Sequence, residues 1–123
     1  MRTVVFLLGL LSGGAVSAAN YTGTGTEFAG FAAAFERSRS QGAIYGGAEV
    51  AMNVSYYQGF VSGAALSTRE KAWCPRGAFT MGQISSVVAK FLADNPELWN
   101  RTPAELVALA LGRAFPCAQD RKK

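Results

Sequence analysis

The 123-residue chain contains no histidine, and this absence excludes several kinds of catalytic site. A Ser-His-Asp triad and a Cys-His pair both need an imidazole as the general base, so neither can be present. Only two cysteines occur, Cys74 and Cys117, and two cysteines without histidine cannot complete a tetrahedral zinc site. We therefore predict that the protein is not an enzyme and binds neither a metal nor a cofactor. A pair of carboxylates brought together by the fold is the alternative left open.

Charge is also scarce, because only 16% of the residues are charged. The chain has 12 Lys and Arg against 8 Asp and Glu, a formal net charge of +4. The basic excess lies at the two ends, at Arg2 and in the run Arg121-Lys122-Lys123. Nucleic-acid binding needs basic residues clustered on one face of the fold. We therefore predict a basic tail over residues 118–123 and no nucleic-acid partner.

The N-terminus has an apolar run that is too short to cross a membrane. Arg2 precedes eight apolar residues, Val4 to Leu11, whereas a spanning helix needs about 20. Small residues follow and end in Val16-Ser17-Ala18, which is typical of a signal peptidase site. We predict a signal peptide over residues 1–18, with cleavage after Ala18 or, alternatively, Ala19. A membrane anchor and a buried first helix are the competing interpretations.

Export suggests a structural role for the two cysteines. Disulfides form in oxidising compartments, so two cysteines in an exported chain most simply bond to each other. A Cys74–Cys117 bond would close a long loop and stabilise the fold by about 4 kcal/mol in the chain-entropy treatment. Two free thiols and an intermolecular bond are the alternatives.

Four helices are predicted, at about residues 27–38, 43–66, 80–95 and 102–115. Thr80 with Gln83 forms a capping box, and Thr102 with Pro103 supplies an N-cap followed by proline at the first helical position. No alternating strand pattern exceeds four residues. We predict a flexible lead-in over residues 19–26 and one all-α domain over 27–117, a small bundle of about four helices stapled by one disulfide. Apolar residues at helical spacing predict the buried faces: Phe28, Phe31 and Phe35 in the first helix, Ile84, Val87, Val88, Phe91 and Leu92 in the third, and Leu106 and Leu109 in the fourth.

The second helix carries small residues four positions apart, at Ala51, Ser55, Gly59 and Gly63. Such a stripe allows another backbone to approach closely, although each glycine costs about 1 kcal/mol of helix stability relative to alanine. We predict close helix packing within the domain. The alternative is a subunit interface, which would make the protein a homodimer. Polar residues in the same helix argue against membrane insertion of the mature chain.

The segment between the last two helices, "DNPELWNRT", combines apolar and charged residues. If those helices form an antiparallel hairpin, the predicted disulfide closes one end and leaves this segment at the tip. We predict that Glu97, Leu98, Trp99 and Arg101 bind a partner, because tryptophan and arginine are frequent interface hot spots. The alternative is that Trp99 folds back and covers the end of the hairpin.

Three strings in this chain resemble a known family. They are "YYQGFVSG" at residues 56–63, "WCPRGAFTMGQISSVVAKFLADNPE" at 73–97 and "TPAELVALALGRAFPC" at 102–117. In order, spacing and cysteine context they resemble the Rap/Tai family of type VI secretion immunity proteins. Many relatives carry an extra cysteine pair in the first two helices, with one member near the position of Tyr57, and this chain lacks it.

The resemblance implies a periplasmic immunity protein that binds and occludes a peptidoglycan amidase effector. It also implies a small helical bundle, often dimeric. A periplasmic helical chaperone of the acid-stress type is the alternative from another class. Without histidine its acid switch would depend on carboxylates and act below about pH 5. A purely structural envelope protein is the third possibility.

Overall fold

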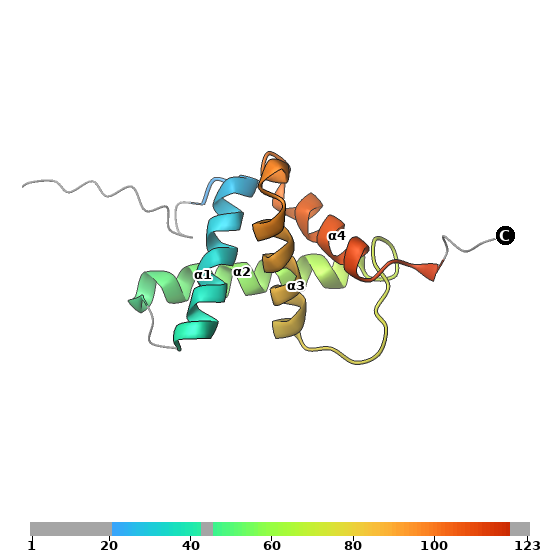
Figure 1. The fold of residues 1–123 in the computed structure, drawn as a ribbon, viewed down its shortest axis with the longest axis horizontal. Helices are drawn as coiled ribbons and strands as arrows, with labels where there is room; N and C mark the ends of the chain where they lie inside the picture. Colours follow the sequence, from blue (N-terminus) through green and yellow to red (C-terminus); the bar gives the residue numbers. More distant parts are fainter. Residues whose placement is uncertain (1–20, 43–45, 119–123) are drawn as a thin grey trace, which may run out of the picture.

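A computed structural model describes residues 21–42 and 46–118. Over these ranges the chain forms four α-helices and one short 3-10 helix, with a single isolated bridge between Arg69 and Trp73 and no strand (Figure 1). The all-α class and the single disulfide predicted from the sequence are confirmed. The elements are α1 (Gly25–Gln41), α2 (Gly47–Thr68), α3 (Met81–Asp94), η2 (Pro96–Leu98) and α4 (Pro103–Ala114).

The helices share one hydrophobic core. α1 and α3 lie side by side, α2 crosses and contacts both, and α4 packs against α3 and α2 (Figure 1). Each helix contributes side chains that are completely shielded from solvent, and the largest in each are Phe28, Tyr57, Ile84 and Leu106. Tyr57 lies between the rings of Phe28 and Phe35, and its hydroxyl donates to the backbone oxygen of Ser85 at 2.7 Å. Burial raises the pKa of Tyr57, so it stays a neutral donor that ties α2 to α3.

Local capping explains where α3 and α4 begin. The Thr80 hydroxyl accepts from the Gln83 backbone N–H at 3.2 Å, and the Thr80 N–H donates to the Gln83 side chain at 2.7 Å. The Thr102 hydroxyl accepts from the Glu105 N–H at 3.3 Å, with proline at the next position. These bonds satisfy backbone donors that the first helical turn leaves free. Both helix starts agree with the sequence prediction.

The predicted lead-in makes contacts with the domain from Tyr21 onward, and α1 starts within it, two residues before the predicted start at residue 27. The flexibility of residues 19–26 stays a prediction. The Tyr21 ring lies 5.3 Å from Phe31 and 4.8 Å from Tyr56, and burial raises its pKa to about 12. The Thr22 N–H donates to the Glu27 carboxylate at 3.0 Å, and α1 starts at Gly25 because Thr24 caps it. Residues 1–18, 19–20 and 119–123, which include the predicted signal peptide and most of the basic tail, lie outside the described residues.

The buried face of α4 differs from the prediction. Leu106 is completely buried as predicted, but Leu109 is only half-buried and lies on the outer side of the helix. The side of α4 that faces the core is therefore shifted around the helix from the predicted side, because α4 packs against both α3 and α2. The buried residues of α4 are Pro103, Leu106, Val107, Ala110 and Leu111.

Candidate functional site

The two cysteines join the loop after α2 to the segment after α4. Cys74 and Cys117 are bonded, with their Cα atoms 4.7 Å apart and a sequence separation of 43. The Cys74 N–H also donates to the Phe115 backbone oxygen at 2.9 Å, so a hydrogen bond and a disulfide join the same two segments of the chain. The predicted pairing is confirmed.

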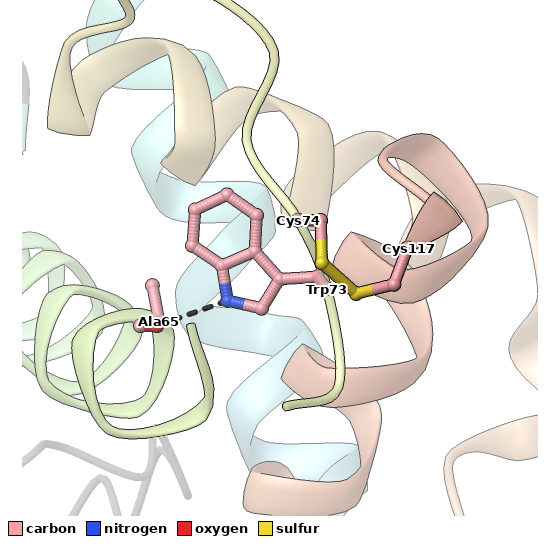
Figure 2. The surroundings of a disulfide bond; sticks show 4 residues. All are labelled: Ala65, Trp73, Cys74 and Cys117. Carbon is pink, nitrogen blue, oxygen red and sulfur yellow. Dashed lines mark hydrogen bonds between the residues drawn. A yellow bond between two sulfur atoms is a disulfide. The ribbon is translucent and has the colours of Figure 1, made fainter. Parts of the chain in front are cut away.

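Trp73 anchors this loop in the core, which the sequence pattern did not indicate. The indole is 1% exposed, and its Nε1–H donates to the Ala65 backbone oxygen near the end of α2 at 2.9 Å. Figure 2 shows the indole directed toward α2 and the disulfide directed toward the end of α4. The rings of Phe79 and Phe115 lie 5.5 Å and 5.9 Å from it. The side chain next to the cysteine therefore fixes the direction in which the loop leaves α2.

At the other end of the α3–α4 hairpin, Trp99 is folded back onto the core. Its Nε1–H donates to the Leu92 backbone oxygen at 2.9 Å, and both Trp99 and Leu98 are half-buried against core residues. Trp99 thus covers the end of the hairpin, as in the alternative interpretation, and partner binding by the residues of the tip stays a prediction. Of the four residues predicted to bind a partner, Glu97 and Arg101 are exposed.

The hairpin tip is also covered by the start of α1. A Cβ atom added at Gly25 would collide with the backbone oxygens of Trp99 and Arg101 and would lie 3.0 Å from Leu106 Cδ1. Figure 1 shows the first turn of α1 beside this tip. Gly25 is thus a position where two backbones approach closely, and no sequence motif indicated it. Its only signal was a glycine directly after a capping threonine.

A groove runs along the outer side of α4. It has a volume of about 500 Å³ and is lined by residues of α4, the residue before its N-cap, and one residue of the loop that carries the disulfide. A Cβ atom at Gly112 would lie 2.8 Å from the Ala72 oxygen, so the absence of a side chain lets the loop approach the helix. The lining residues are Ala72, Arg101, Glu105, Ala108, Leu109, Gly112 and Arg113.

The described residues form two ion pairs, Glu36–Arg39 at 3.4 Å and Lys90–Asp94 at 2.7 Å. The charged residues along this groove take part in neither pair and have no other ion-pair partner in the described part of the chain. Both of those pairs are solvent-exposed, and such pairs contribute little to stability. Arg113 instead places its guanidinium 5.2 Å above the Phe91 ring. The charges of the groove are therefore available to a partner.

Within the described residues, no three acidic or cysteine side chains gather into a set that could hold a metal ion. No helix in the same ranges is both long and apolar enough to span a bilayer.

The family model of Rap1a immunity proteins matches residues 24–117. The chain belongs to the Rap1a immunity protein family. No curated protein and no solved structure matches the chain. The Rap1a match begins at Thr24, the N-cap of α1, and ends at Cys117, so it includes all four helices and both ends of the disulfide.

The small residues of α2 do not pack inside this Rap1a domain. Ala51, Ser55, Gly59 and Gly63 are exposed, and a Cβ atom at either glycine would meet nothing within 4 Å. The predicted packing within the domain is therefore wrong, because α1, α3 and α4 all lie on the opposite side of α2. The alternative, contact with another subunit, stays a prediction.

Two glycines of this Rap1a domain, Gly59 and Gly25, should change the free energy of unfolding in opposite directions when they are replaced by alanine. Gly59→Ala is expected to raise the free energy of unfolding by about 0.5–1 kcal/mol, because the site is open and alanine is the better helix former. Gly25→Ala is expected to lower it by about 1–3 kcal/mol, because the new methyl group displaces the hairpin tip. Urea unfolding of both variants in dilute solution measures the two effects. A destabilising Gly59→Ala would show that the face of α2 is covered.

Proposed function

We propose that the protein is a periplasmic immunity protein that binds and occludes a peptidoglycan amidase effector of type VI secretion. The observation that carries this proposal is the Rap1a match over residues 24–117, which includes the whole helical domain. Rap1a proteins are immunity proteins, and an immunity protein acts by binding a toxin. The amidase as the toxin and type VI secretion as its route are the parts that this proposal adds.

Two features of the chain support a periplasmic location. The disulfide closes a loop between residues 43 positions apart, and such bonds persist in oxidising compartments. The N-terminal sequence has a positive start, a short apolar run and small residues before Ala18, as expected of a signal peptide over residues 1–18. The mature protein would then begin one or two residues before Tyr21, whose ring already packs against the domain.

Inhibition in this proposal needs no chemistry from the immunity protein. The protein contributes a rigid surface, held by the core at Trp73, by the disulfide and by the Tyr57 hydrogen bond between α2 and α3. Rigid surfaces bind with a smaller loss of conformational entropy than mobile ones. An amidase cleft covered by such a surface would be closed to peptidoglycan.

The residues predicted to make contacts lie on two surfaces. Glu97 and Arg101 are the exposed members of the predicted tip, so an effector contact there would be polar and would leave Trp99 in place. The outer face of α2 carries no charged residue after Glu49 and exposes Met52 and Leu66 at 44% and 59%. We propose that face as the contact with a second copy in a homodimer.

The function is tested with a panel of type VI peptidoglycan amidase effectors. The purified mature protein is expected to abolish the peptidoglycan hydrolysis of at least one of them at stoichiometric concentration. Isothermal titration against the same enzyme with its catalytic cysteine replaced by alanine would give the affinity without turnover. As a control, the same protein unfolded by reduction and urea, then diluted, should not inhibit before it refolds.

Absence of inhibition and of binding across the panel would contradict the proposed function. Suppression of the aggregation of unrelated acid-unfolded proteins, with no effect on any amidase, would favour the chaperone alternative instead.

A further inference from the structure

We infer that the effector places an apolar side chain, flanked by carboxylates, in the groove along the outer side of α4. This inference rests on the proposed function and adds the contact surface and the chemistry of the group that it receives. The groove is formed by α4 and by the loop at Ala72, and it is distinct from the small-residue face of α2.

The floor of the groove is apolar and is shaped by the fold. Ala108 and Gly112 leave space, and Leu109 is the large apolar side chain that α4 turns away from the core. Because Gly112 has no side chain, the Ala72 carbonyl approaches the helix and closes one side of the groove. A volume of about 500 Å³ accommodates a large side chain of a partner together with its neighbours.

The charges at the rim indicate what kind of segment binds. Arg101 precedes α4 and Arg113 lies in its last turn, so the two arginines lie near opposite ends of the helix. Neither forms an ion pair within the described part of the chain. Arg113 is also held in place over Phe91, which reduces the entropy that it loses on binding. Arginine binds carboxylates with two parallel hydrogen bonds, so two arginines at the ends of an apolar floor fit an acidic segment with a central apolar side chain.

The groove is continuous with the predicted tip, because Arg101 belongs to both. Glu105 lies between the two arginines and would repel a carboxylate placed at the centre. This favours an occupant whose acidic groups lie at its two ends. A segment of this kind on the effector could contact Glu97 and Arg101 at the tip and then follow α4 toward Arg113.

The test compares variants of the mature protein in titration against an amidase that the wild-type protein inhibits. Arg101→Glu combined with Arg113→Glu is expected to weaken binding by about 30-fold or more, as loss of an interface hot spot does. Leu109→Glu, which places a like charge on the floor, is expected to have a similar effect. Arg113→Glu alone is also compared with its charge-matched control, Arg37→Glu, because Arg37 is an exposed arginine on α1 and away from the groove. The affinity of Arg37→Glu should equal that of the wild-type protein.

Thermal unfolding followed by circular dichroism shows whether each variant is folded. Arg101 and Arg113 are exposed, so their replacement should leave the fold intact. The weakening should also shrink as salt is raised, because salt screens both the attraction of the wild-type arginines and the repulsion by the glutamates that replace them. Unchanged affinity of folded groove variants would overturn this inference while the proposed function stands. An equal loss in Arg37→Glu would also overturn it, because net charge and not the groove would then govern binding. If the wild-type protein binds no amidase, the proposed function itself fails.

Discussion

Replacing Trp73 by alanine is expected to lower the free energy of unfolding by about 3–5 kcal/mol. The indole is 1% exposed and contacts the rings of Phe79 and Phe115, so its removal leaves a cavity at the junction of three segments. The substitution also removes the hydrogen bond to the Ala65 oxygen at 2.9 Å. Domains of this size are stable by about 5–15 kcal/mol, so the variant would lose a large part of its stability. Equilibrium unfolding in urea measures the change.

Trp73→Phe is the matched control for this prediction. It keeps an aromatic ring in the cavity and removes only the indole N–H, so most of the loss should be recovered. The remaining difference from the wild-type protein should be about 0.5–1.5 kcal/mol, the net value of one hydrogen bond, plus a small packing term. If Trp73→Ala cost less than about 1 kcal/mol, the loop would not depend on this anchor.

Removing the disulfide is expected to cost about 4 kcal/mol, because the unfolded chain regains the freedom of a loop between residues 43 positions apart. Thermal and urea unfolding of the wild-type protein and of the double variant Cys74→Ala with Cys117→Ala measure this cost. Wild-type protein in reductant should lose a similar amount. A melting temperature that is the same with and without reductant would contradict the prediction.

The reduced protein should nevertheless keep its fold in mild conditions. The Cys74 N–H still donates to the Phe115 oxygen, and Trp73 still holds the loop on α2. Trp73→Ala combined with loss of the disulfide should therefore lower the free energy of unfolding more than either change alone. Because the two sites are adjacent, their effects on stability are not expected to be additive.

The sequence by itself determined the features that depend on neighbouring residues. The starts of α3 and α4 follow from hydrogen bonds between Thr80 and Gln83 and between Thr102 and Glu105, and a local bond of this kind can be read from spacing. The disulfide followed from the count of two cysteines in a chain with the pattern of an exported protein. The all-α class followed from helical periodicity in the absence of strand patterns.

Only the tertiary structure decided which side of α2 and which side of α4 are covered. The stripe of glycines on α2 has the spacing of a packed face, yet Gly59 meets nothing, while Gly25 lies against the backbone of the hairpin tip. Spacing shows that residues share a face, but it does not show where the other helices lie. In the same way, the direction of Trp99 depends on the Leu92 oxygen, and the exposure of Leu109 depends on how α4 meets α2 and α3. These contacts join segments far apart in the chain, so no local pattern encodes them.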